Sequence, residues 1–309
     1  MRDNQNSIAV IAFKFNDIFY SLATEELNNS GFKILILLLT ENMSSGSFPC
    51  QNKFDKVIKI YYRKNFLFFF FAWLQVLWKL KKHRVEKVLL SNPILVINQL
   101  IISKLKANKI IFLEDGLMNY FPFSPPRYKV KTFVQKIFCL EDDEIFNRIE
   151  YTYLLKPDEA VFYKGTPRKL HLNEFIDEQS HRSLRGQLKD KAVFAGQPLY
   201  NIGIFSIEEY NEAVNKLIQK YNIDYYIPHP FSSEKEKIDC PYLDLNKEKV
   251  TLEVLAYDCN FTVYSFGSSI SYTTKLINPC IKSILFKPRQ WSNRVLDMIT
   301  RHCDQVISL

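Results

Sequence analysis

The stretch SIAVIAFKFNDIFYSLATEELNNSGFKILILLL, residues 7–39, decides the fold. Its two ends are almost wholly apolar, whereas its middle alternates apolar and polar residues at helical spacing and ends at Gly31, a residue type common just past helix ends. The stretch therefore predicts a strand, a helix and a second strand. Apolar strands that alternate with helices indicate a parallel sheet that is covered on both faces.

The same alternation continues through both halves of the chain. The first half adds expected strands in KVIKIYY, EKVLLSN and NKIIFLEDG, with helices at residues 65–78 and 94–106. The second half places strands in AVFAGQPL, DYYIPHP, FTVYSFGSS and KSILFKP, again with helices between them. One of these helices is expected in SIEEYNEAVNKLIQKYN, where Ser206 as N-cap and Glu209 three residues on form a capping box. A polar stretch near residues 178–190 separates the two sets. We therefore predict an α/β protein with two Rossmann-like domains facing a cleft, residues 1–185 and 186–309.

The composition indicates a globular protein with a basic surface. The 309 residues are 47% hydrophobic, enough for a large core, and the formal net charge at pH 7 is +8. That charge fits either a basic solvated surface or an anionic partner such as a membrane surface or a phosphorylated ligand. No nucleic-acid-binding motif is present, so we expect no nucleic acid. The six cysteines form no C-x-x-C pair and are expected to be free thiols in a reducing compartment.

The segment NFLFFFFAWLQVLW, residues 65–78, allows two interpretations. It is too short to span a membrane, which takes about 20 apolar residues. It is either a core helix that ends in a solvated basic turn, or a helix that lies on an anionic membrane with its lysines on phosphates. Because the N-terminus has no signal-peptide pattern, the expected location is the cytoplasm, with a peripheral position on the inner face of the cell membrane as an option.

Four loops follow expected strands, where ligands bind in open parallel sheets. They are EDG at 114–116, GQP at 196–198, HP at 229–230 and SFGSS at 265–269. Neither G-x-x-x-x-G-K-[ST] nor G-x-G-x-x-G occurs, which argues against an ordinary nucleotide P-loop and against a dinucleotide enzyme.

The residues of these loops suit group transfer. Glu114 or Asp115, shaded by aromatic neighbours, can take a proton from a hydroxyl, although either can instead cap a turn. His229 stands between two prolines of fixed φ and can bond a phosphate or protonate a leaving group. Ser268 and Ser269 open a helix, where an anion is favoured.

The order EDG, GQP, YIPHP, YSFGSS resembles bacterial sialyltransferases of the GT-B type, most closely glycosyltransferase family 52, which includes lipooligosaccharide and capsule sialyltransferases. The resemblance is clearest over residues 190–288. It implies an inverting transfer of sialic acid from CMP-sialic acid to a glycan hydroxyl, such as a galactoside of a surface polysaccharide or lipooligosaccharide. It also implies that the enzyme needs no cofactor and no essential metal.

The resemblance assigns roles to individual residues. Glu114 or Asp115 would be the base, and His229 would meet the CMP phosphate as it leaves. The residues expected to bind the donor are Gly196, Gln197, Pro198, His229, Pro230, Ser265, Ser268 and Ser269. Some family members carry an acid directly after the G-x-P motif, where this chain has Leu199. This departure shifts the expected base to the EDG acids, with Asp115 slightly favoured.

Two other functions stay open at the level of the sequence. One is a GT-B transferase that uses another nucleotide sugar, such as a UDP sugar, and the other is a non-catalytic membrane-surface protein. For an enzyme, the expected partners are a nucleotide sugar donor and a glycan acceptor, with an anionic membrane surface as a further candidate. The sequence predicts no oligomeric state.

Overall fold

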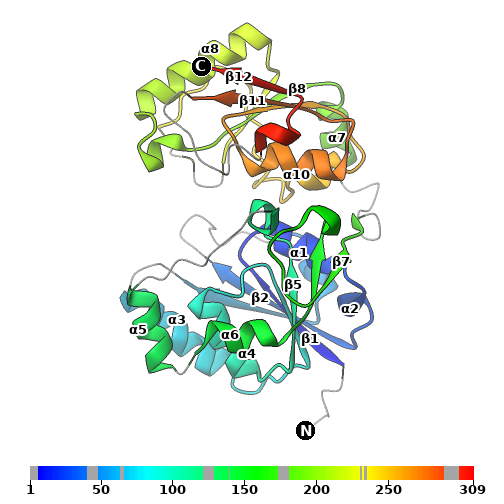
Figure 1. Cartoon of the computed structure of the whole chain (residues 1–309), viewed down its shortest axis with the longest axis vertical. Helices are drawn as coiled ribbons and strands as arrows, with labels where there is room; N and C mark the ends of the chain where they lie inside the picture. The colour runs from blue at the N-terminus through cyan, green and yellow to red at the C-terminus, as the bar shows by residue number, and fades with distance from the viewer. Residues whose placement is uncertain are drawn as a thin grey trace. The chain divides into compact units, whose positions relative to one another are not determined.

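A computed structural model of the chain describes residues 6–39, 48–62, 66–120, 129–138, 140–172, 181–229, 232, 235–288 and 299–309. The chain divides into two compact units, Met1–Phe175 and Ile176–Leu309, each with its own parallel sheet and helices (Figure 1). This division lies before the expected boundary at 185/186, and helix α7 (Arg182–Leu188) belongs to the second unit. The carbonyl of Arg185 in α7 accepts a bond from the Cys259 thiol there.

The first unit contains a seven-stranded sheet in the order β3-β2-β1-β4-β5-β6-β7. The strands are β1 (Ser7–Ala12), β2 (Phe32–Leu39), β3 (Lys56–Tyr61), β4 (Lys87–Leu90), β5 (Lys109–Leu113), β6 (Ile149–Leu154) and β7 (Thr166–Lys169). Val10 of β1 stands opposite Leu35 of β2 and Leu89 of β4. Strands β2 and β3 lie on one side of β1, and β4 to β7, which come later in the chain, lie on the other side. The strand order therefore reverses between β1 and β4, and ligands bind at such a position in parallel sheets.

Helices cover both faces of this sheet (Figure 1). They are α1 (Phe15–Leu22), α2 (Glu25–Asn28), α3 (Phe66–Lys79), α4 (Val96–Leu105), α5 (Lys129–Ile137) and α6 (Asp142–Asn147). Buried residues of α3 and α4, among them Val76 and Ile101, share one core cluster with the strands. The single helix expected before Gly31 is two helices, because the Thr24 hydroxyl caps the second one by accepting the Leu27 N–H at 3.4 Å.

Strands β6 and β7 extend the sheet into a region, residues 149–169, in which the sequence pattern predicted no strand. Pro167 lies within β7, which is the edge strand of the sheet. Proline lacks a backbone N–H, and a sheet edge is the position that tolerates this loss. A proline-containing, exposed edge strand has no apolar alternation, which explains why the pattern did not reveal it.

The second unit contains a five-stranded parallel sheet in the order β12-β11-β10-β8-β9. The strands are β8 (Ala192–Ala195), β9 (Tyr225–Ile227), β10 (Thr262–Ser265), β11 (Lys282–Lys287) and β12 (Gln305–Ser308). The helices include, besides α7, α8 (Ile207–Tyr221), α9 (Leu252–Ala256) and α10 (Ser269–Ile277). Short 3-10 segments among the described residues include Gln51–Lys53, Gly116–Tyr120, Pro157–Glu159 and Leu199–Ile202. The core of this unit is aromatic: Phe194 contacts Phe266 and Phe286, at ring-centroid distances of 5.3 and 6.3 Å. The two parallel sheets confirm the predicted pair of Rossmann-like domains.

The capping box expected at the start of α8 gives a test of the second unit. The Ser206 hydroxyl accepts the Glu209 N–H at 3.1 Å, and the Glu209 carboxylate accepts the Ser206 N–H at 2.7 Å. We expect Ser206→Ala to lower the free energy of unfolding by about 1 kcal/mol, because one helix N–H loses its acceptor. Urea denaturation followed by circular dichroism measures this loss. Ser206→Asp, which keeps an acceptor, should retain most of the stability, and an equal loss in both variants would contradict the role of the cap.

Candidate functional site

The carboxyl edge of the second sheet brings together most of the residues expected to bind the donor. Ser265, Ala195 and Ile227 stand side by side as the last residues of β10, β8 and β9. The loops that follow therefore leave the sheet at one edge, where the strand order reverses. The predicted residues at this edge are Gly196, Gln197, Pro198, His229, Ser268 and Ser269, and Pro230 lies outside the described residues.

Two serines stand at the start of helix α10. Ser268 is the N-cap residue, and its hydroxyl accepts the backbone N–H of Ile270 at 3.3 Å. Ser269 is the first helical residue and is exposed. Backbone N–H groups at a helix start and the dipole of the helix attract an anion. Both serines are therefore placed where a phosphate can bind.

Ser265 has a different position from the other two serines. It is fully buried, and its hydroxyl lies 2.7 Å from the Ser271 hydroxyl. The same hydroxyl accepts the backbone N–H groups of Gly267 and Ser268, at 3.2 and 3.3 Å. Ser265 therefore holds the loop in shape from inside, and the predicted contact between its hydroxyl and the donor would have to compete with these bonds.

Gly196 is required by a close contact beneath the GQP loop. A Cβ atom at this position would lie 2.4 Å from the hydroxyl oxygen of Tyr226 and 2.8 Å from its ring carbon Cζ. The backbone N–H of Gln197 donates to the Tyr210 hydroxyl at 3.2 Å. The loop therefore rests on two tyrosine hydroxyls, and glycine is needed here for packing against the core.

These tyrosines belong to a buried network that sequence reasoning missed. The Tyr210 and Tyr226 hydroxyls are 3.1 Å apart, and Tyr226 donates to Glu236 at 2.8 Å. Tyr200 donates to the other oxygen of Glu236 at 2.7 Å. Burial raises the pKa of Tyr210 and of Tyr226, so both stay protonated donors at neutral pH. The feature of the sequence that could have revealed this network is the presence of tyrosines at apolar positions of α8 and β9.

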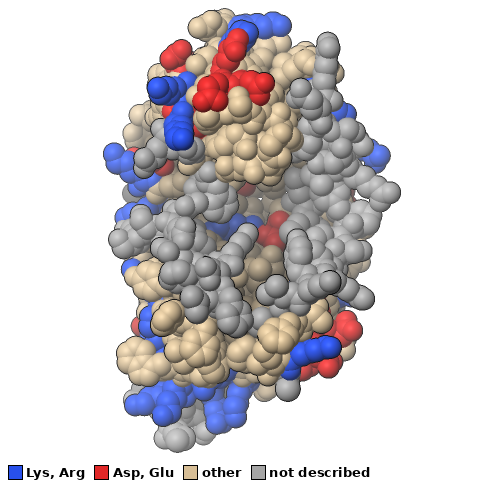
Figure 2. All heavy atoms as spheres, turned by 90° about the vertical axis from the view of Figure 1, so that its left-hand side faces the viewer, with Lys and Arg blue, Asp and Glu red and all other residues tan. Residues whose placement is uncertain are grey.

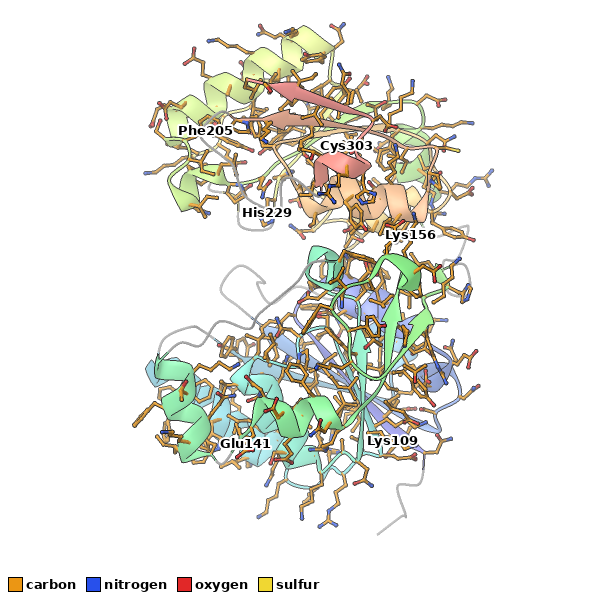
Figure 3. The ribbon with its side chains drawn as sticks, in the orientation of Figure 1. Lys109, Glu141, Lys156, Phe205, His229 and Cys303 are labelled. Atoms are coloured by element: carbon orange, nitrogen blue, oxygen red, sulfur yellow. The ribbon has the colours of Figure 1, made fainter. Side chains whose placement is uncertain are left out.

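His229 lies in the loop after β9 (Figure 3) and is partly buried. Its backbone N–H donates to the Ser232 hydroxyl at 3.1 Å, and its carbonyl accepts the Ser232 N–H at 2.8 Å. Burial lowers the pKa of the imidazole from 6.5, so the ring is mainly neutral at pH 7. A neutral imidazole can donate one N–H to an anion, and an approaching phosphate favours uptake of a second proton.

In the first unit, the two adjacent acids after β5 have separate environments. Glu114 is fully buried, and its Oε2 accepts the Tyr120 hydroxyl at 2.7 Å and the Leu155 N–H at 2.5 Å. Asp115 keeps 13% of its side chain exposed and accepts an ion-pair contact from Lys14 Nζ at 2.6 Å. Glu114 thus ties β5 to the loop after β6, whereas Asp115 faces the loops at the sheet edge.

Residues from β1 and β4 complete a polar cluster around Asp115, and the sequence analysis missed them. The Asn92 amide lies 3.5 Å from Asp115. Asp17 is fully buried and accepts the backbone N–H groups of Phe13 and Lys14, at 2.7 and 3.0 Å. Burial raises the pKa of Asp17, and Lys14 and the hydroxyl of Ser91 partly offset this. Ligand-binding residues in parallel sheets lie beyond the carboxyl ends of the strands, so an examination of the residues after β1 and β4 would have found this cluster.

Two kinds of feature are absent from the described residues. They contain no group of three or more His, Cys, Asp or Glu side chains able to hold a metal ion. None of the helices within the described ranges is both long and apolar enough to cross a membrane.

Comparison with solved structures identifies the fold. UDP-N-acetylglucosamine 2-epimerase from Rickettsia bellii is 13% identical, with a TM-score of 0.50, over 88% of this chain and 76% of that chain. A putative UDP-N-acetylglucosamine 2-epimerase from Listeria monocytogenes is 8% identical, with a TM-score of 0.50, over 96% and 82% of the two chains. Such low identity shows a shared fold alone. A search of curated proteins found no match.

The family model of glycosyltransferase family 52 matches residues 37–287, which is most of the chain. The matched region contains the acids after β5, His229 and the serines at the start of α10. It also contains the buried tyrosine network beneath the GQP loop. The chain therefore belongs to glycosyltransferase family 52, as its motifs indicated, and it is a glycosyltransferase.

Proposed function

We propose that this glycosyltransferase moves sialic acid from CMP-sialic acid to a hydroxyl group of a glycan, with inversion at the anomeric carbon and without an essential metal. The observation that carries the proposal is the placement of His229 and Ser268 on loops that follow β9 and β10, the two neighbours of β8, at one edge. A phosphate group suits both residues. The order of the four motifs favours CMP-sialic acid over other nucleotide sugars, and a surface polysaccharide or lipooligosaccharide as the acceptor.

In this reaction the acceptor oxygen bonds to the anomeric carbon while the bond from that carbon to the phosphate oxygen of CMP breaks. The electron pair of the broken bond leaves with CMP. Asp115 takes the proton of the acceptor hydroxyl, and His229 and Ser268 bond the departing phosphate. Lys14 and Asn92 orient the carboxylate of Asp115, since both contact its oxygens.

Asp115 is a better candidate for the base than Glu114. A base must reach the acceptor hydroxyl, and the side chain of Asp115 is partly exposed while Glu114 is fully buried. Glu114 instead has the contacts of a structural residue, since it accepts bonds from Tyr120 and Leu155.

We also propose that the enzyme acts in the cytoplasm. Five cysteines of the described residues are free thiols, which suits a reducing compartment: Cys50, Cys240, Cys259, Cys280 and Cys303.

The donor is tested by ligand-induced stabilisation. We expect CMP to raise the thermal midpoint of the full chain, and UDP to raise it much less at the same concentration. A ligand at about 100 times its Kd adds roughly 2.7 kcal/mol to the stability of the folded state. Cytidine, which lacks the phosphate, is the matched control and should have little effect. Equal stabilisation by CMP and UDP would contradict the sialyl donor while leaving glycosyl transfer intact.

The two acids are separated by isosteric amides. Asp115→Asn should lower the transfer rate by about 10²–10⁴-fold, the usual value of general base assistance, at nearly unchanged stability. Glu114→Gln should lower the free energy of unfolding by about 1–3 kcal/mol, because the Tyr120 hydroxyl and the Leu155 N–H would then donate to a neutral amide oxygen, which is a weaker acceptor than a carboxylate. Transfer assays and urea denaturation measure both effects. Near-normal transfer by Asp115→Asn would remove Asp115 from the mechanism.

The protonation of His229 predicts how CMP affinity varies with pH. The free imidazole has a pKa below 6.5 and is neutral at pH 7, whereas a bound phosphate favours the imidazolium. Binding therefore takes up a proton, and affinity should rise as pH falls from 7.5 towards 6. Titration calorimetry of the wild type and of His229→Gln measures this rise. The phosphate of CMP also titrates near pH 6 but contributes equally to both proteins. The same pH slope in both would show that His229 does not bond the phosphate.

A further inference from the structure

Helix α3 is apolar on two opposite faces. On the inner face, Ala72 and Val76 are at most 1% exposed and pack in the core beneath the sheet. The outer side chains are strongly exposed, from 41% to 76%: Phe70, Phe71, Leu74 and Trp78. These four positions recur every three to four residues and so form a stripe along the helix. The core covers only one face of α3. The interpretation of residues 65–78 as a core helix therefore describes the inner face, and the interpretation as a membrane-contacting helix concerns the outer face.

Helix α5 extends the apolar surface of α3. Phe133 and Ile137 are 59% and 56% exposed. Phe138, at the end of α5, contacts Trp73 of α3 with ring centroids 5.3 Å apart, which places the two helices side by side. We call the six exposed side chains of α3 and α5 the aromatic face. Figure 2 shows this side of the molecule, where uncharged side chains gather, with lysines and arginines at the lower edge.

A basic groove adjoins the aromatic face where α3 and α4 end. It encloses about 410 Å³, and Trp73, Leu77 and Phe138 are among its apolar lining residues. Four cationic side chains line it: Lys81, Arg84, Lys104 and Lys106. His83 lines it as well, but burial and the nearby Lys56 lower the pKa of its imidazole. No carboxylate is among the lining residues in the described part of the chain. The groove thus offers positive charge and an apolar wall to the same ligand.

The cationic and apolar side chains of the groove indicate which kind of ligand it binds. An anionic headgroup that continues into a hydrocarbon chain matches the cationic and apolar walls together. Exposed Trp and Phe next to lysines are the side chains that enter the interface of a bilayer. The acidic first turn of α6, residues 142–144, lies nearby, but Asp142 is bonded by Lys131 at 2.8 Å and by Gln135. That ion pair reduces the repulsion of an anionic surface.

We propose that the aromatic face and the basic groove form a docking surface for an anionic phospholipid bilayer, with a lipid phosphate bound in the groove. The groove lies beside the amino ends of β4 and β5, since residues 81–84 precede β4 and residues 104–106 precede β5. Asp115 follows the carboxyl end of β5. Docking therefore leaves the edge with the acids uncovered, so an acceptor can still reach Asp115.

The test is sedimentation of the full chain with vesicles. We expect binding to vesicles of phosphatidylglycerol and phosphatidylcholine, weaker by at least tenfold in 0.5 M NaCl because salt screens exposed charges. Vesicles of phosphatidylcholine alone should bind at least tenfold less. Absence of binding to the anionic vesicles at low salt would overturn the proposal.

Variants separate the groove from general surface charge. Lys81→Glu with Lys106→Glu should weaken binding at least tenfold, whereas the matched pair Lys216→Glu with Lys220→Glu on α8 should leave it nearly unchanged. Equal effects of the two pairs would exclude a role of the groove. Soluble glycerol phosphate should compete no better than NaCl of equal ionic strength, and stronger competition would indicate a site for free phosphate.

The aromatic face is tested by Phe71→Gln with Trp78→Gln, which should abolish most vesicle binding. Brominated lipids should quench the fluorescence of wild-type Trp78, and Trp78→Phe should lose that quenching.

Sedimentation velocity tests whether a second copy of the chain covers the aromatic face instead. If the wild type is a dimer that Phe71→Gln with Trp78→Gln converts to a monomer, a second copy covers the face and the proposal is wrong. All variants should keep their thermal response to CMP, so a failure of this proposal is distinguishable from a failure of the proposed donor.

Discussion

All strands of each sheet run in the same direction, and the candidate sites depend on this constraint. Residues at strand ends far apart in the sequence, such as Ala195, Ile227 and Ser265, become neighbours because parallel pairing aligns their ends. The same alignment brings residues after β1, β4 and β5 around Asp115 in the first unit. A parallel strand must return through a crossover, so the loops at the carboxyl edge are free to carry polar side chains while helices cover both faces.

Buried polar groups hold these loops in shape from beneath. Glu114 joins the loop after β5 to that after β6 through Leu155, and Ser265 holds the loop before α10. Tyr226 and Glu236 support the GQP loop in the same way. Such groups are costly to bury unless they are hydrogen-bonded, so each fixes the loop that bonds it. Asp115, which is partly exposed, and Ser269, which is exposed, lie on loops that these buried groups hold in place.

Sequence patterns predicted the strands that are apolar along their length, because burial on both faces leaves a clear signal. They predicted the capping box at Ser206 as well, since that interaction is local. They did not reveal β7, where Pro167 and edge exposure remove the signal, nor the division of one expected helix at Thr24. For the candidate site, motifs indicated Asp115 and His229, but Lys14 and Asn92 reach Asp115 only through the folded sheet, and no local pattern marks such pairs.

The contact between Gly196 and Tyr226 limits which residues can occupy the GQP loop. Any side chain at position 196 would displace the Tyr226 ring, and with it the hydroxyl bonded to Glu236. Gln197 and Pro198 are only partly buried, so they can be replaced without disturbing that ring. A library of loop variants should therefore randomise these two positions and keep the glycine.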